Sequence, residues 1–307
     1  ARHLAAAHGV RDLLLVSRRG SEAPGAGQLV SDLAQLGARA TVRACDVADR
    51  DALAAVLDGV DLSGVVHAAG VLDDGLIGDL SAGRLGRVVA AKAESALHLH
   101  ELTADRELSA FVLFSSFAGV VGNAGQAAYS AANNVLDALA RVRRAQGLPA
   151  VSLAWGMWAN ADGMGGTLGD ADLERMARQG FPALETREGL DLLDAALLVN
   201  EPIAVPVALR TPALAAVRDS LPGILQGLVP AASRQRRAAG QVGAAAASGL
   251  ARKLAGLQPA EQERQLLDVV QAQVAAVLGH ASAGSIDTSR AFKDLGFDSL
   301  TAVDLRN

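Results

Sequence analysis

The 307-residue sequence predicts an α/β fold in which a doubly wound parallel sheet is covered by helices on both faces. Short apolar runs alternate with segments of helical periodicity over most of the first 210 residues. Strands that alternate with helices in this way pair in parallel through right-handed crossovers. Half of the residues are hydrophobic but only 3% are aromatic, so the core must be built mainly from Ala, Val and Leu.

The predicted strands are short runs rich in valine and leucine, as expected of parallel strands that are buried on both faces. In chain order they are Leu13–Val16, Ala40–Cys45, Leu62–His67, Phe111–Phe114, Ala150–Ala154 and Ile203–Leu209. The predicted helices lie between them. They are the end of a helix closed by Gly9, then Pro24–Leu36, a helix capped by Asp49 that runs to Leu57, Leu85–Leu102, the segment that carries Tyr129, and Gly189–Val199.

The character of the sequence changes after about residue 228. An Ala-, Gly- and Arg-rich stretch without core periodicity predicts a linker over residues 229–256. Helical periodicity then returns at Leu266, Val269, Val270, Val274 and Val277. We therefore expect a large α/β domain at 1–228 and a smaller helical domain at 257–307. Since both ends fall inside predicted helices, we expect the chain to be cut from a longer protein.

The composition excludes several classes of function. The net charge is −5 and no long basic block is present, so we expect no nucleic-acid partner. Cys45 is the only cysteine, which rules out an internal disulfide and a thiolate metal cluster. His98 and His100 are two residues apart on a predicted helix and do not share a face, so we expect no metal site. No apolar run approaches the roughly 18 residues of a membrane span, and we expect a cytoplasmic protein.

Three predicted strands end in residues suited to a dinucleotide. Ser17, Arg18 and Arg19 follow the first strand, where arginine suits the 2′-phosphate of NADP. Asp46 and Val47 follow the second strand and could receive an adenine amino group. Ala68, Ala69 and Gly70 follow the third and allow close approach of the backbone to a cofactor. The alternative is an exposed basic turn. The phosphate-binding Gly-x-Gly-x-x-Gly is absent, and we expect it just upstream of Ala1.

A serine at a strand end and a tyrosine on the next helix form a candidate proton-transfer site. Ser116 ends the strand at Phe111, and Tyr129, the only tyrosine, lies on the following helix. A phenol has a pKa near 10, so reversible proton transfer at neutral pH needs a nearby cation, which Lys92 could supply. Asn133 lies four residues after Tyr129 on the same face. The alternatives are a loop serine, a packed tyrosine and an exposed helical lysine.

Together these residues resemble the ketoreductase domain of modular type I polyketide synthases, a complex branch of the short-chain dehydrogenases. The resemblance covers residues 1 to about 228. It rests on Ser17-Arg-Arg-Gly20, Cys45-Asp-Val-Ala-Asp49, His67-Ala-Ala-Gly-Val-Leu-Asp-Asp74, Phe114-Ser-Ser116, Gly125-Gln-Ala-Ala-Tyr129 and Leu153-Ala-Trp-Gly156. It implies a Rossmann-like fold whose first strand and glycine-rich loop are missing from this sequence. In simpler members of the superfamily a lysine follows the tyrosine by four residues, where this chain has Asn133, and in polyketide ketoreductases the lysine is upstream.

The resemblance implies an active site of Lys92, Ser116, Tyr129 and Asn133. The implied reaction is hydride transfer from NADPH to the β-carbonyl of a carrier-tethered β-ketoacyl thioester. Tyr129 would donate the proton, Ser116 would orient the oxygen, and Lys92 would lower the pKa of the phenol. The segment Trp155–Trp158, with Trp155 and Gly156 as cofactor-binding residues, and the region 163–169 would border the nicotinamide and form a mobile lid.

The resemblance also implies the stereochemistry of the product. Leu72-Asp73-Asp74 resembles the loop signature of B-type reductases, which give the D-configured hydroxyl, and Gln126 belongs to the same substrate-facing group. A-type enzymes carry tryptophan at the position of Val121. Ala132 is not the proline associated with the epimerising B subtype.

Residues 257–307 resemble the first part of an acyl carrier domain. Gly296-Phe-Asp-Ser-Leu300 matches the attachment motif for 4′-phosphopantetheine, which would modify Ser299; the alternative is a serine that only caps a helix. The implied partners are the tethered acyl chain, upstream ketosynthase and acyltransferase domains, and a phosphopantetheinyl transferase. Dimerisation would use regions outside this chain. Two alternatives to a reductase are a catalytically silent structural segment and an epimerase that uses the same pocket.

Overall fold

The structure is a computed structural model that describes residues 1–159, 170–229, 254, 256–278, 284, 286–288, 290–292 and 305. It divides into two compact units. The first comprises Ala1–Gly166 and Leu184–Val207, and the second comprises Thr167–Ala183 and Ala208–Asn307. The predicted domains 1–228 and 257–307 and the linker 229–256 stay predictions, because most of the linker lies outside the described residues.

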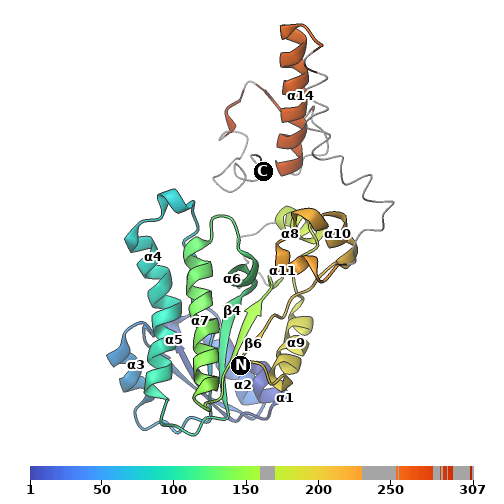
Figure 1. The fold of residues 1–307 in the computed structure, drawn as a ribbon. Helices are drawn as coiled ribbons and strands as arrows, with labels where there is room; N and C mark the ends of the chain where they lie inside the picture. The colour runs from blue at the N-terminus through green and yellow to red at the C-terminus, as the bar shows by residue number, and fades with distance from the viewer. Residues whose placement is uncertain are drawn as a thin grey trace. The chain divides into compact units, whose positions relative to one another are not determined.

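The strands of the first unit are parallel and follow the predicted order (Figure 1). They are β1 (Asp12–Ser17), β2 (Arg39–Ala44), β3 (Gly64–His67), β4 (Ala110–Ser116), β5 (Val151–Trp155) and β6 (Ile203–Ala204). The prediction that the last strand reaches Leu209 is wrong. Pro206 has no backbone N–H to donate to a ladder, which explains why the regular pairing ends early.

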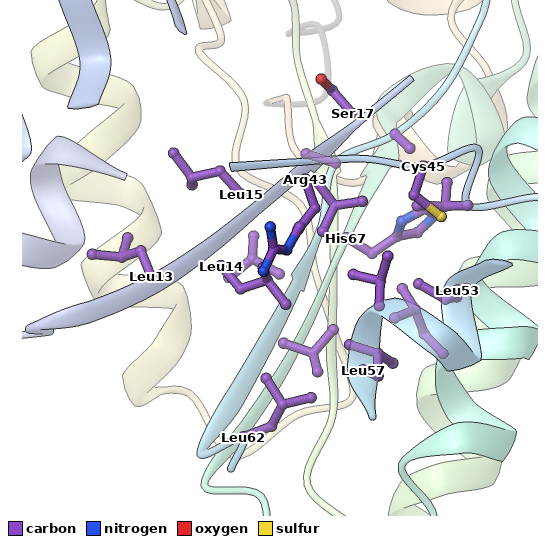
Figure 2. A pocket seen from close by; sticks show the side chains of 18 of the residues that line it. Leu13, Leu14, Leu15, Ser17, Arg43, Cys45, Leu53, Leu57, Leu62 and His67 are labelled. Carbon is purple, nitrogen blue, oxygen red and sulfur yellow. The ribbon is translucent and has the colours of Figure 1, made fainter. Parts of the chain in front are cut away.

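Two groups of strands form two separate sheets, β1–β2 and β3–β4–β5–β6. Among the described residues no ladder joins β1 to β3, and both strands line a cavity of about 1690 Å³ (Figure 2). The apolar side chains along it are incompletely covered: Val66 of β3 is 48% exposed. This gap between the sheets agrees with the expectation that the first strand of the fold is not part of the sequence.

Helices pack on both faces of the first unit. They are α1 (Arg2–Ala7), α2 (Ala26–Gln35), α3 (Arg50–Leu57), α4 (Ala82–Val89), α5 (Ser95–Leu102), α6 (Phe117–Val121), α7 (Ala127–Ala145) and α9 (Thr186–Leu198). Alternate side chains of β1 pack on opposite faces of the sheet. Leu14 and Val16 pack against the main core, which contains Phe111, whereas Leu13 and Leu15 pack against a second core around Leu33. The doubly wound prediction is therefore confirmed.

The helix predicted over Leu85–Leu102 contains a turn of different geometry. Between α4 and α5 the residues Ala90–Glu94 form a π-helical turn, and Lys92 lies within it. Such turns insert one extra residue per turn and are frequent at functional sites. The turn therefore sets the direction in which the Lys92 side chain leaves the helix.

The predicted cap of α3 is confirmed. The Asp49 carboxylate accepts hydrogen bonds from the backbone N–H groups of Asp51 at 3.1 Å and Ala52 at 3.0 Å. These bonds satisfy two of the N–H groups that a helix start leaves without partners. The cap fixes the start of α3, and with it the path of the segment between β2 and α3 that contains Asp46 and Val47.

The second unit is helical in its described part. Its helices are α8 (Asp170–Arg178), α10 (Thr211–Ala216), α11 (Gly223–Gln226) and α14 (Pro259–Leu278). The predicted helical periodicity after residue 257 is confirmed by α14, whose Val274 and Ala275 are buried with Ile286. No helix among the described residues combines the length and the apolar character that a membrane crossing requires.

Candidate active site

The end of β4 presents two serines, which differ in access. Ser115 is 4% exposed, and its hydroxyl donates to the backbone oxygen of Asn133 at 3.3 Å. Ser116 is half-buried, and its Oγ accepts from the N–H of Ala118 at 3.2 Å, which starts α6. The Ser116 hydroxyl also interacts with the Tyr129 phenol. The structure therefore brings Ser116, and not Ser115, together with Tyr129.

Tyr129 and Asn133 lie one turn apart on α7. The Tyr129 side chain is 9% exposed. The amide Nδ2 of Asn133 donates to the backbone oxygen of Tyr129 at 2.7 Å, but its buried Oδ1 has no partner among the described residues. A buried acceptor without a donor is costly, and it marks a place for a hydrogen bond from a ligand or from water.

Lys92 reaches this site from the π-helical turn. Its side chain is 1% exposed, so the alternative of an exposed helical lysine is wrong. Its ammonium donates to the backbone oxygen of Phe114 at 2.9 Å. The same Nζ lies 5.4 Å from the centre of the Tyr129 ring. The four residues that sequence assigned to catalysis thus gather around the end of β4.

Burial shifts the pKa values of both proton-transfer groups. It lowers the pKa of Lys92 to about 8, so the ammonium form still predominates at neutral pH. Burial also raises the pKa of Tyr129; the polar side chains of Ser116 and Asn133 lower it, and the charge of Asp74 raises it further. Tyr129 is therefore protonated in the resting protein. The expected lowering of the phenol pKa by Lys92 is not seen in this state and stays a prediction for the phenolate.

A network of arginines holds the loop that contains Leu72, Asp73 and Asp74. The Asp73 carboxylate accepts from Arg84 at 2.7 Å and also from Arg87. Arg84 also donates to the backbone oxygen of Asp74 at 2.7 Å. These arginines were missed by the sequence reasoning, since nothing in their spacing links them to the loop.

The same loop is attached to the segment before α7. Gln126 donates to the Asp74 carboxylate at 2.8 Å, and the N–H of Gly75 donates to the backbone oxygen of Gly125 at 2.8 Å. Leu72 is 38% exposed, and Val121 is half-buried at the end of α6. The predicted stereocontrol residues Asp74 and Gln126 are thus in direct contact, and Gln126 lies only three positions before Tyr129 in the chain.

His67 is buried at the end of β3. It is 3% exposed, and its Nε2 lies 2.9 Å from the backbone oxygen of Lys92 and 3.2 Å from the Ser95 hydroxyl. Burial lowers its pKa to about 4, so the imidazole is neutral at physiological pH. His67 therefore supports the π-helical turn through its contact with the Lys92 backbone, and we assign it no role in proton transfer.

Most of the predicted cofactor residues line the cavity between the two sheets. Those that do are Ser17, Arg18, Asp46, Val47, Ala68, Ala69 and Gly70. Arg19 is exposed next to them but is not part of the lining.

Trp155 and Gly156 lie elsewhere, at the end of β5. Trp155 packs on Phe114 and Trp158, and its buried Nε1 has no partner within the described part of the chain. Ser299 and the predicted lid at 163–169 lie outside the described residues.

A parallel sheet of this order, with a serine at a strand end and a tyrosine and a lysine beside it, defines a Rossmann-like fold of the short-chain dehydrogenase type. Comparison with protein families gives a match to the KR domain over residues 1–160. The chain therefore belongs to the ketoreductase (KR) domain family of modular polyketide synthases, whose members are β-ketoacyl reductases.

Similar proteins agree with this assignment. The chain is 53% identical over its whole length to polyketide synthase GfsB of Streptomyces halstedii, and 50% identical to mycoketide-CoA synthase of Mycobacterium tuberculosis. It spans 6% and 8% of the lengths of these relatives. A solved A-type ketoreductase from a modular polyketide synthase is 44% identical, with a TM-score of 0.67 over 75% of this chain and 49% of that chain.

Proposed function

We propose that this chain reduces the β-carbonyl of a carrier-bound β-ketoacyl thioester, with NADPH as hydride donor, to a D-configured β-hydroxyacyl thioester. The observation that carries the proposal is the buried Lys92 ammonium 5.4 Å from the ring of Tyr129, at the strand end that presents Ser116. A proton donor, a cation and a hydroxyl at one strand end suit the reduction of a carbonyl group.

Each of the four proposed active-site residues has a different role in the proton transfer. Tyr129 donates its phenolic proton to the carbonyl oxygen as that oxygen gains charge, which is why its protonated resting state matters. Ser116 donates a hydrogen bond to the same oxygen and orients it. Lys92 stabilises the phenolate that remains, because a charge–charge interaction is strong in a water-poor site. The Oδ1 of Asn133 offers an acceptor for a donor on substrate or solvent.

The residues at the strand ends fit NADPH, which supplies the hydride when bound. Arg18 is exposed directly after β1, at the carboxyl end of the strand, where a guanidinium can pair with the 2′-phosphate. Ala68, Ala69 and Gly70 are small and directly follow β3, so they would leave room for the cofactor to approach the backbone. We include Arg19, Ser17, Asp46 and Val47 in the same cofactor site, with Trp155 and Gly156 on the nicotinamide side.

The stereochemical part of the proposal rests on Leu72, Asp73, Asp74 and Val121. Solved relatives described as A-type share the fold at 44% and 43% identity, which does not distinguish the types. The arginine network supports the B-type assignment because it fixes Asp73 and Asp74, and Asp74 contacts Gln126 in the segment that leads to Tyr129.

We also propose that Ser299 carries 4′-phosphopantetheine and that the chain works with the other domains of a polyketide synthase. The helical periodicity of α14, found where an acyl carrier domain would begin, supports the carrier assignment. The relatives support the partner assignment, since they are long synthases of which this chain matches a small part.

The test is an assay of the full-length protein that carries this chain, with NADPH and a β-ketoacyl thioester deuterated at the α-carbon. We expect one NADPH to be oxidised per D-β-hydroxyacyl product. A control without thioester should oxidise none. Loss of α-deuterium faster than in an enzyme-free sample, without NADPH oxidation, would indicate an epimerase. Exchange at the enzyme-free rate without NADPH oxidation would indicate a silent segment; both results would overturn the proposal.

A further inference from the structure

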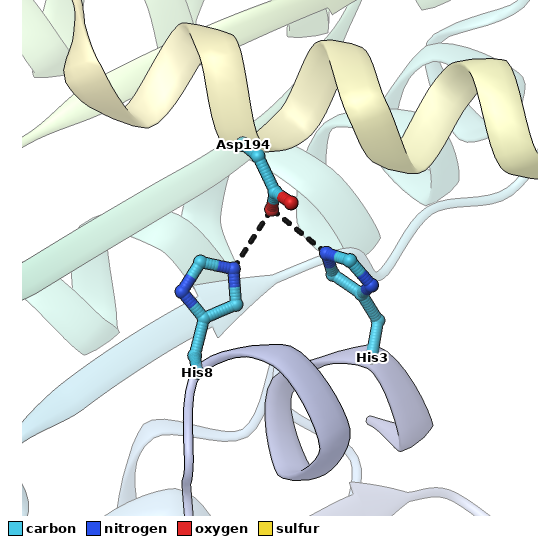
Figure 3. A group of neighbouring side chains, drawn as sticks. All are labelled: His3, His8 and Asp194. Carbon is cyan, nitrogen blue, oxygen red and sulfur yellow. Dashed lines mark hydrogen bonds and ion pairs between the residues drawn. The ribbon is translucent and has the colours of Figure 1, made fainter.

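Three side chains from distant parts of the chain converge at the surface of the first unit. His3 and His8 come from the α1 region, and Asp194 comes from α9 (Figure 3). The same carboxylate oxygen, Oδ1 of Asp194, lies 2.7 Å from Nε2 of His3 and 2.7 Å from Nε2 of His8. Both imidazole nitrogens therefore face the same carboxylate oxygen, and the three potential ligand atoms all lie within 4.8 Å of one another.

The donor set is that of a transition-metal site. Two imidazoles and a carboxylate, with water as the fourth ligand, bind Zn²⁺ in a tetrahedral arrangement. The cysteine count does not exclude a site of this kind, because it needs no thiolate.

The spacing requires only a small adjustment. Zn–N and Zn–O bonds of about 2.1 Å at a tetrahedral angle place neighbouring ligand atoms about 3.4 Å apart. Each imidazole nitrogen must therefore move away from the oxygen by about 0.7 Å. The side chains can make this movement because they lie at the surface: His3, His8 and Asp194 are 19%, 36% and 38% exposed.

We propose that His3, His8 and Asp194 bind a divalent transition-metal ion, with Zn²⁺ as the best match. None of the four proposed catalytic residues lies on α1 or α9, so the ion has a structural role.

The ion joins the parts of the first unit that belong to different sheets. Through Ala5, α1 packs on the core of α2, β1 and β2. On the other side, α9 packs its Gly189 against the Trp158 ring and leads to β6. The metal site therefore links α1, which packs on the β1–β2 core, to α9, which leads to β6.

The test is titration of the chelator-treated full chain with Zn²⁺, followed by calorimetry and thermal unfolding. We expect one ion to bind and the unfolding temperature to rise, since a ligand that binds only the folded state stabilises it. His3→Gln and His8→Gln keep an N–H that can donate to Asp194 but remove the imidazole. Each should weaken Zn²⁺ binding by at least about tenfold and abolish the rise in unfolding temperature.

His98→Gln is the matched control, because it removes a histidine of the same unit that lies on α5 and should leave Zn²⁺ binding unchanged. Co²⁺ provides a second measurement that does not depend on stability, since a tetrahedral site gives it strong visible absorption. The proposal fails if the wild-type chain binds no Zn²⁺, or if the glutamine variants bind Zn²⁺ and colour Co²⁺ as the wild type does.

Discussion

Replacing Tyr129 with phenylalanine is expected to lower kcat for reduction of a β-ketoacyl thioester by about 10²- to 10⁴-fold, the usual contribution of a general acid. The change removes only the phenolic hydroxyl. The buried ring, its packing against Val88 and Ala132, and its contact with Lys92 all remain. The affinity for NADPH and the unfolding temperature should therefore change little, and the loss should appear in kcat.

A control for this variant lies next to it on α7. Ser130 also carries a hydroxyl, which donates to the backbone oxygen of Ala118 at 2.9 Å and is not one of the proposed catalytic groups. Ser130→Ala should keep kcat close to that of the wild type. Near-normal turnover of Tyr129→Phe would show that the phenol is not the proton donor.

Replacing Lys92 with methionine is expected to lower kcat by about 10²-fold and to change its pH dependence. In the wild type the ammonium has a pKa of about 8, so kcat should fall as the pH rises through this value and the stabilising charge is lost. The variant has no ammonium to lose, and its residual activity should not show this fall. Steady-state kinetics from pH 6.5 to pH 9 measures both effects.

The stability of the same variant separates catalysis from folding. Because the folded-state pKa of Lys92 is lower than its unfolded value, the unfolded chain binds more protons between about pH 8 and pH 10.5. Burial of the charge therefore costs stability below pH 8, and this cost falls as the pH rises through that window. Methionine has a similar length and no charge, so the unfolding temperature at pH 7 should be retained. A large decrease, or an unchanged pH profile, would contradict the assigned role.

The strands, the sheet class and the cap of α3 could be predicted because they depend on local patterns. Alternating apolar runs fixed the strands, and a single carboxylate in front of Arg50 fixed the cap. The early end of β6 shows the limit of that method. The apolar character continues beyond Ala204, but a proline that cannot donate interrupts the ladder.

The candidate site was predictable in its residue types but not in its geometry. Ser116, Tyr129 and Asn133 lie within 18 positions of one another, and a strand followed by a helix suffices to bring them together. Lys92 needed the π-helical turn Ala90–Glu94, whose hydrogen bonds depend on tertiary packing around His67. No local pattern in the sequence announces such a turn.

Contacts between distant segments were beyond the reach of sequence periodicity. Arg84 and Arg87 lie on α4, and both pair with Asp73 in the loop that follows β3. His8 and Asp194 are separated by 186 positions, and only the packed fold shows that they face each other. The expectation of no metal site considered histidines that are close in sequence, which is why this cluster was not found.

Hydride transfer to the β-carbon is the step that tests the proposed function most directly. The full-length protein that carries this chain is supplied with a β-ketoacyl thioester and NADPH that carries deuterium at both C4 positions of the nicotinamide. Mass spectrometry and chiral chromatography should then find one deuterium on the β-carbon of a D-configured β-hydroxyacyl product. A product without deuterium at that carbon, or NADPH that stays unoxidised, would contradict the assignment of this site as a β-ketoacyl reductase.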